Sequence, residues 1–138
     1  MKVINLTPHV IRLNDGREFP PSGKVARVSV FYNTTRPLSL FYLFVDRQTG
    51  ESKPDLQCDE QVTEYAEDLP FYEQTYGEIE GLPERTYKDV LYIVSSMVLA
   101  ALKHNGDGRI DVVAPATGHH ELKRDQNGNI VSVPGFTY

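Results

Sequence analysis

The sequence predicts an α+β fold, mainly β, with a largely antiparallel small sheet or barrel-like core, one short helix and an inserted β-hairpin arm. Three observations predict this fold class. Short runs rich in β-branched and aromatic residues recur along the chain. Most of them are separated by tight turn sequences such as Asp15-Gly16 and Asn127-Gly128, which join neighbouring strands in opposite directions. A single short segment, residues 96–103, switches to good helix formers.

The N-terminal quarter of the chain is predicted to consist of short strands. Asp15-Gly16 indicates a hairpin turn of type I′, because aspartate and glycine tolerate the backbone angles of that turn. Pro20-Pro21-Ser22-Gly23 then breaks the pattern sharply. The expected strands are residues 2–6, 10–14, 17–19 and 25–30.

The rest of the chain alternates in the same way, with the helix in its second half. Serine is a preferred N-cap, and the switch from strand to helix falls on Ser95 and Ser96. Gly106 suits the left-handed conformation that ends many helices, so the helix should stop there. The expected strands are residues 38–45, a weaker 61–65, 71–79, 87–94, 109–114, and a last hairpin of 121–124 with 129–133.

A chain of 138 residues fits one domain, 1–138, with an insertion at about residues 31–70. No apolar run reaches the roughly 18 residues of a membrane span, and no signal peptide is visible. The only cysteine, Cys58, cannot form an internal disulfide, which agrees with a reducing compartment. Its acidic neighbours disfavour a thiolate nucleophile. We therefore expect a cytoplasmic protein.

Charge is distributed unevenly along the sequence. Residues 51–89 hold twelve acidic and three basic residues, a net charge of −9, so the remainder carries +4 of the total of −5. An acidic chain repels nucleic acid, and no cluster of basic residues interleaved with aromatics is present. The acidic segment is most simply a solvated face or arm, and a dock for a basic partner or a mimic of nucleic-acid charge stays open.

The strand-to-helix junction at Ser95 and Ser96 is the place where the residues suggest a ligand class. A strand that feeds a serine-capped helix leaves free N–H groups and the positive end of a helix dipole at one point, which suits an anion such as phosphate. Small-residue loops, including Thr117 and Gly118, let backbone amides approach a ligand closely. The other predicted ligand-binding residues are Thr7, His9 and Tyr92, which would grip the ligand, and Arg27 and Arg109, one or the other of which would neutralise its charge.

His119-His120-Glu121 contains metal-ligand residue types, but adjacent side chains on a strand point to opposite faces. A metal site there would need His9 or His104 as a further ligand, so no metal site is predicted, and the segment is most simply an exposed loop before the final hairpin. Likewise, His9 after Thr7-Pro8 is more simply a rigid structural corner. Glu78 and Glu80 share one strand face, which is most simply solvated.

Several motifs follow one another in a recognisable order. They are Asn5-Leu6-Thr7-Pro8-His9, Pro20-Pro21-Ser22-Gly23, Tyr76-Gly77-Glu78-Ile79-Glu80-Gly81-Leu82-Pro83, Tyr92-Ile93-Val94-Ser95 and Arg124-Asp125-Gln126-Asn127-Gly128-Asn129-Ile130. With them the chain resembles a family of small uncharacterised proteins encoded by phages and prophages, and it departs from that family at about residues 31–70. The resemblance implies a viral accessory protein and supplies no catalytic residue. In that setting, small folds often block host immunity by sequestering a nucleotide signal or a host protein.

The resemblance implies a phage-encoded counter-defence protein in the host cytoplasm. Together with the strand-to-helix junction, it favours one that sequesters a small phosphate-bearing, nucleotide-like ligand without chemistry or cofactor. We expect neither nucleic acid nor a membrane as a partner. We expect the chain to form a homodimer. The alternative is an inhibitor that binds a host defence protein through the aromatic and acidic insertion. A metal-dependent hydrolase using His9, His119 and His120 is the third hypothesis.

Overall fold

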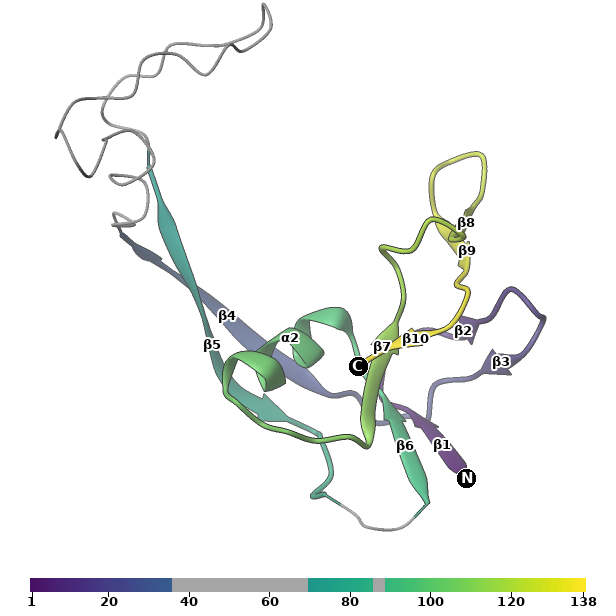
Figure 1. Ribbon diagram of the computed structural model, residues 1–138, viewed down its shortest axis with the longest axis horizontal. Helices are drawn as coiled ribbons and strands as arrows, with labels where there is room; N and C mark the ends of the chain where they lie inside the picture. Colours follow the sequence, from purple (N-terminus) through teal and green to yellow (C-terminus); the bar gives the residue numbers. More distant parts are fainter. Residues whose placement is uncertain (36–69, 86–88) are drawn as a thin grey trace, which may run out of the picture. The chain divides into compact units, whose positions relative to one another are not determined.

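The structure, a computed structural model, describes residues 1–35, 70–85 and 89–138 and divides into two compact units (Figure 1). The first unit comprises residues 1–29 and 76–138, and the second comprises residues 30–75. The fold class is confirmed as α+β and mainly β, and the described strands close no barrel. The predicted strands 38–45 and 61–65 and Cys58 lie outside the described residues. The single domain of residues 1–138 stays a prediction.

The first unit is built on a four-stranded sheet in the order β1-β6-β7-β10. Strand β6 pairs in parallel with β1 and β7, whereas β10 is antiparallel to β7. This arrangement departs from the largely antiparallel sheet expected, because α2 carries the chain back across the sheet between β6 and β7. The bounds are β1 Lys2–Asn5, β6 Val90–Ile93, α2 Ser96–His104, β7 Val112–Pro115 and β10 Phe136–Thr137.

Helix α2 begins and ends where the sequence predicts. The Ser95 hydroxyl accepts a hydrogen bond from the Val98 N–H at 3.3 Å, which confirms the serine N-cap. At the other end Gly106 has a φ of 71°, and its N–H donates to the Lys103 carbonyl at 3.1 Å. The Asp107 N–H donates to the Leu102 carbonyl at 2.9 Å, which completes a Schellman motif.

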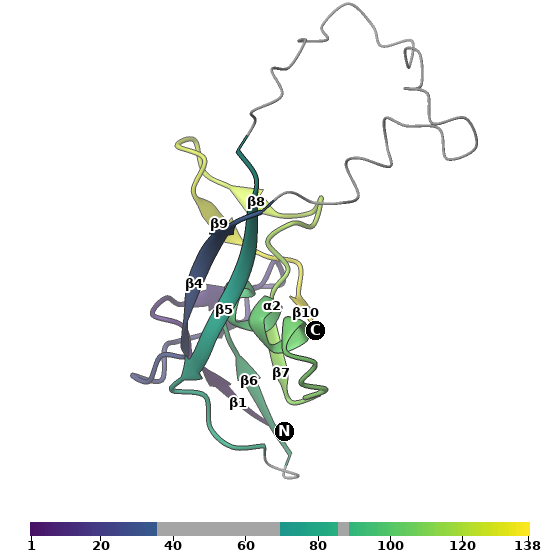
Figure 2. The same ribbon diagram turned by 90° about the vertical axis from the view of Figure 1, so that its left-hand side faces the viewer.

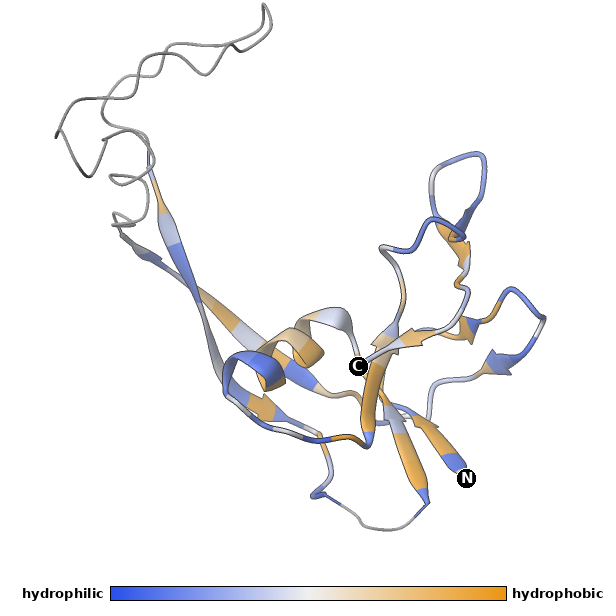
Figure 3. Ribbon diagram, in the orientation of Figure 1, coloured by the Kyte–Doolittle hydropathy of each residue, from blue (hydrophilic) through white to orange (hydrophobic). Residues whose placement is uncertain are grey.

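The core lies between α2 and the central strands. Strand β7 is buried along its whole length, and Figure 3 shows β6 and β7 as largely apolar ribbons. Parallel strands that are covered by a helix read as apolar runs rather than as alternating patterns, which explains Tyr92-Ile93-Val94. The buried residues of this cluster are Leu6, Ala26, Tyr92, Val94, Val98, Leu99, Leu102, Val112 and Ala114.

Two hairpins extend the first unit, β2 (Ile11–Arg12) with β3 (Glu18–Phe19) and β8 (Lys123–Arg124) with β9 (Ile130–Ser132). The first turn is a three-residue loop and not the expected two-residue type I′ turn, because the Leu13 N–H donates to the Arg17 carbonyl. The second hairpin closes in the same way, and backbone N–H groups of Asn127 and Asn129 donate to Asp125 Oδ1. The Asn129 N–H contributes most to lowering the pKa of the Asp125 carboxyl.

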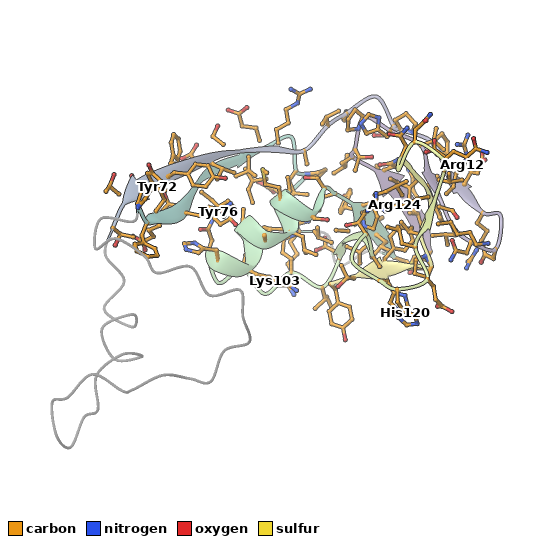
Figure 4. All side chains as sticks on the ribbon, turned by 90° about the horizontal axis from the view of Figure 1, so that it is seen from above. Arg12, Tyr72, Tyr76, Lys103, His120 and Arg124 are labelled. Atoms are coloured by element: carbon orange, nitrogen blue, oxygen red, sulfur yellow. The ribbon has the colours of Figure 1, made fainter. Side chains whose placement is uncertain are left out.

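Strands β4 (Arg27–Thr34) and β5 (Tyr72–Glu80) form a separate two-stranded sheet, which Figure 2 shows side-on. Their inner ends belong to the first unit, where Tyr76, labelled in Figure 4, packs against α2. The Tyr76 and His104 rings meet edge-on with centroids 5.3 Å apart. In the second unit the Asn33 amide donates to Thr75 Oγ1 at 3.3 Å, and Tyr32 is exposed.

Replacing Gly81 with alanine is expected to lower the free energy of unfolding by about 2–5 kcal/mol. Gly81 has a φ of 75°, where a β-carbon costs about 1–2 kcal/mol. That carbon would also overlap the Val25 carbonyl oxygen, and overpacking adds about 1–3 kcal/mol. Urea denaturation followed by circular dichroism measures the loss.

Gly23 is the matched control for Gly81. Its φ is 88°, but no atom lies within 4 Å of the position that a β-carbon would occupy. Gly23→Ala should therefore lower the free energy of unfolding only by the cost of a β-carbon at positive φ, about 1–2 kcal/mol. Equal losses in the two variants would show that Val25 does not press on Gly81.

Candidate functional site

A hollow of about 530 Å³ opens beside the start of α2 in the first unit. Its wall is formed by the first residue of the helix, by the segment that follows β7 and by the C-terminal strand β10. The lining residues are Ser96, Pro115, Ala116, Thr117, Gly118, His119, Phe136 and Thr137.

The parallel strands explain why these segments meet. Strand β6 ends at Ile93 and leads into α2, and β7 ends at Pro115 and leads into Ala116-Thr117 (Figure 1). Because carboxyl ends of neighbouring parallel strands lie at the same edge of a sheet, both exits face the same region. Open α/β sheets bind their ligands at this edge. Strand β10 pairs with the end of β7 and adds Phe136 to the wall.

The start of α2 presents hydrogen-bond donors. The helical ladder starts with the bond from the Leu99 N–H to the Ser95 carbonyl, and the Ser95 hydroxyl takes the Val98 N–H. The N–H groups of Ser96 and Met97 have no acceptor within the described part of the chain. Together with the helix dipole, they favour a negatively charged group at this end.

Three polar side chains in the wall are available to a ligand. The hydroxyls of Ser96, Thr117 and Thr137 make no hydrogen bond to another described residue. The wall also contains two flat rings, the Phe136 phenyl ring and the His119 imidazole. A molecule with an anionic group and a flat ring therefore finds matching groups here.

The structure brings only part of the predicted binding set together. Ser96, Thr117 and Gly118 line the hollow, as the sequence predicts, and Ser95 lies next to them as the helix cap. The other predicted residues do not line it: Thr7, His9, Arg27, Tyr92 and Arg109.

Thr7 and His9 lie near the edge strand β1 and not near β7, which borders the hollow. They follow β1, and β6 separates β1 from β7 in the strand order. The buried Thr7 donates its hydroxyl to Asn5 Oδ1 at 2.7 Å. The Asn5 amide in turn donates to the His9 carbonyl and to the Phe19 carbonyl, each at 2.8 Å. The Thr7-Pro8-His9 corner is therefore organised by Asn5.

Arg109 is held in a buried ion pair away from the hollow. Its side chain and that of Asp111 are 7% and 8% exposed, and two parallel hydrogen bonds of 2.9 and 2.7 Å join them. It also donates to the Pro83 carbonyl at 2.6 Å and lies 5.8 Å from the centre of the buried Tyr92 ring. The Asp111 carboxylate raises the pKa of Arg109 above its ordinary value.

No lysine or arginine lines the hollow, within the residues that the structure describes. Arg27, the other predicted source of positive charge, is an exposed residue at the start of β4. The hollow therefore offers an anion backbone amides and hydroxyls rather than a fixed cation.

The His119-His120-Glu121 segment is exposed and lies outside any strand, as expected for a loop before the final hairpin, although Glu121 itself was expected to begin the strand of residues 121–124. It forms a turn, in which the Leu122 N–H donates to the His119 carbonyl at 3.1 Å. The two imidazole rings stack with centroids 4.3 Å apart, so they do not point to opposite faces. The argument from strand alternation against a metal site therefore does not apply, because a turn does not alternate as a strand does.

Several residues of the site are not part of the sequence-based prediction. Phe136 and Thr137 reach the hollow because β10 returns beside β7, a long-range pairing that leaves no local pattern. His119 follows Thr117 and Gly118 in the same loop. Outside the hollow, Asn5 carries a local signal, because an asparagine side chain often accepts a hydrogen bond from the N–H two residues further on, here that of Thr7, in an Asx turn.

Comparison with family models, with curated proteins and with solved structures finds no match for this chain. Within the parts that the structure describes, no helix is both long and apolar enough to cross a membrane. The geometry of the hollow thus carries the functional argument.

Proposed function

We propose that this chain is a binding protein that captures a small phosphate-bearing, nucleotide-like ligand in the hollow beside α2 and holds it without chemistry. One observation carries the proposal. The start of a serine-capped helix, the hydroxyls of Ser96 and Thr117 and the Phe136 ring all border one open space.

Each part of such a ligand has a counterpart in the wall. The N–H groups of Ser96 and Met97 and the helix dipole suit the phosphate, which helix N-termini bind in many proteins. The hydroxyls of Ser96 and Thr117 add donors to the same region. The Phe136 ring offers a face for a planar base. The volume of about 530 Å³ falls in the usual range for small-molecule sites, roughly 300–1,000 Å³.

The resemblance to phage and prophage proteins supplies the biological setting of the proposal. A phage protein that captured a nucleotide signal in the host cytoplasm would act as a counter-defence sponge. Capture without turnover would suffice for that role, because removing free ligand lowers its effective concentration.

Ser96→Ala and Thr117→Val are expected to weaken ligand binding by about 10-fold or more each. A hydrogen bond to a charged group contributes about 1.5–3 kcal/mol, and about 1.4 kcal/mol corresponds to a factor of ten. The measurement is isothermal titration calorimetry with a panel of inorganic phosphate, nucleoside monophosphates and cyclic mono- and dinucleotides. Ligand that is recovered by chromatography should be chemically intact.

Ser29→Ala serves as the matched control, because Ser29 is an exposed serine of the first unit outside the hollow. It should bind as the unmodified chain does. Equal affinity of all three variants for a ligand of the panel would place binding elsewhere, and no binding across the panel would remove the proposal. Recovery of a cleaved ligand would replace capture by catalysis.

A second candidate function is inhibition of a host factor through the second unit. The observation that favours it is a group of exposed aromatic side chains on β4 and β5, namely Phe31, Tyr32 and Tyr72 at 54%, 65% and 59% exposure. Exposed apolar groups of this kind often mark interaction surfaces. The calorimetry separates the two functions, because an inhibitor of this type needs no small ligand.

A further inference from the structure

Three consecutive metal-ligating side chains, His119, His120 and Glu121, gather at the turn between β7 and β8. One ligand atom from each lies within 4.8 Å of the others, and all three residues are exposed. Figure 4 shows the His120 side chain directed away from the ribbon. Two imidazoles and one carboxylate are the donor set of many zinc sites.

The turn itself produces this gathering. The bond from the Leu122 N–H to the His119 carbonyl closes the chain on itself, so the three side chains leave from one tight loop. The Glu121 N–H donates to His119 Nδ1 at 3.1 Å, and the Glu121 carboxylate oxygen lies 3.9 Å from the same nitrogen. The local backbone therefore holds one imidazole against one carboxylate.

We propose that the His119-His120-Glu121 turn binds a divalent transition-metal ion of the zinc type. In a tetrahedral site with bonds of about 2.0–2.2 Å, two ligand atoms are about 3.3 Å apart. The separation of 3.9 Å between His119 Nδ1 and the Glu121 oxygen thus needs to close by about half an ångström. His120 has further to move, and its exposed side chain has room to rotate.

Binding rearranges few existing contacts. The ion takes the lone pair of His119 Nδ1, so the Glu121 N–H turns to water, which is accessible at this exposed turn. The two rings leave their stacked arrangement, because in-plane lone pairs of parallel rings cannot meet at one ion. Three protein ligands leave a fourth position of the tetrahedron open to water or another donor.

The position of the turn gives the ion a relation to the hollow. His119 lines the hollow as well as belonging to the turn. Among the described residues, the lining contains neither lysine nor arginine, and a bound divalent ion would supply positive charge at its rim. The metal site stands on its own geometry and does not depend on the proposed capture of a phosphate-bearing ligand.

The test is titration of the full chain, without an affinity tag and after treatment with a chelator, with Zn²⁺ and separately with Co²⁺. We expect one ion per chain by calorimetry and the visible absorption of tetrahedral Co²⁺. His119→Ala and His120→Ala should each weaken binding at least about 10-fold, since even residues that only support a ligand change metal affinity about 10–100-fold. Circular dichroism checks that both variants stay folded.

His9→Ala is the matched control, because His9 is exposed and follows β1 rather than β7. It should bind Zn²⁺ as the unmodified chain does. Absence of binding, or unchanged Zn²⁺ affinity in both His119→Ala and His120→Ala, would overturn the proposal. Because the probe is the metal alone, this outcome is independent of whether any phosphate-bearing ligand binds.

Discussion

Asp111→Ala is expected to lower the free energy of unfolding by about 3–5 kcal/mol, because it leaves the buried Arg109 guanidinium without its carboxylate. The pair is joined by two hydrogen bonds, and its side chains are less than a tenth exposed. A buried charge without a counter-ion carries the full free-energy cost of its desolvation. The hydrogen bond to the Pro83 carbonyl offsets only part of that cost. Urea denaturation, analysed with a two-state model, measures the loss.

An exposed pair of the same chemistry provides the control. Arg12 Nε lies 2.8 Å from a Glu18 carboxylate oxygen, but both side chains are more than half exposed. Glu18→Ala should therefore cost about 0–1 kcal/mol, because water replaces the lost partner. If Asp111→Ala cost no more than Glu18→Ala, the buried pair would not stabilise the fold as argued.

The double variant Arg109→Met/Asp111→Leu separates the pair from the charge that its disruption leaves behind. Replacing both buried ions by apolar residues of similar volume is often close to neutral, so the double variant should be more stable than Asp111→Ala. Its affinity for a ligand of the hollow should also be unchanged, since neither residue lines the hollow. A loss of ligand affinity in a folded double variant would return Arg109 to the binding set that the sequence predicts.

Local chemistry made the helix predictable. The serine at position 95, the apolar residues that follow it and the glycine at position 106 each act on immediate neighbours in the chain, and the helix has both predicted ends. Gly128 likewise marks its hairpin, because a positive φ is a property of one residue.

Long-range pairing was beyond the same reasoning. β1 and β6 are separated by more than eighty residues, and nothing in either segment states that they pair in parallel. Tight turns pointed to an antiparallel sheet, and they do govern the hairpins β2–β3 and β8–β9. The direction of the central sheet instead follows from the α2 crossover.

In the candidate site, too, residues that depend on local sequence were predictable, and those that depend on long-range contacts were not. Ser96 and Thr117 were predictable because each comes within three residues of the end of an apolar strand, so both lie near strand ends. Arg109 was predicted as a free cation because its partner, two residues further along, is recognisable only when both side chains are seen to be buried. Phe136 lines the hollow because β10 pairs with β7, and no local sequence pattern predicts that pairing.

Asn5→Ala is expected to lower the free energy of unfolding by about 3–5 kcal/mol. The buried Asn5 amide donates to two carbonyls, those of His9 and Phe19, and its oxygen accepts from the Thr7 N–H and hydroxyl. Alanine satisfies none of these four groups. The Thr7 hydroxyl and the His9 carbonyl keep their own bond of 3.1 Å, but the Phe19 carbonyl and the Thr7 N–H lose their bonds to Asn5. Each buried polar group left without a partner costs about 1–3 kcal/mol. Thermal and urea denaturation measure the loss.

Graded variants resolve how Asn5 stabilises the corner. Thr7→Val removes one donor and should cost less than Asn5→Ala. Asn5→Asp keeps the acceptor but loses the amide N–H groups that donate to the His9 and Phe19 carbonyls, of which the His9 carbonyl still accepts from the Thr7 hydroxyl. Asn33→Ala is the control, because exposed Asn33 makes one side-chain bond to another described residue, of 3.3 Å to Thr75. If Asn5→Ala cost no more than Asn33→Ala, packing alone would hold the Thr7-Pro8-His9 corner. If the expected order is found, one buried amide sets the end of β1 beside the strand that leads into α2.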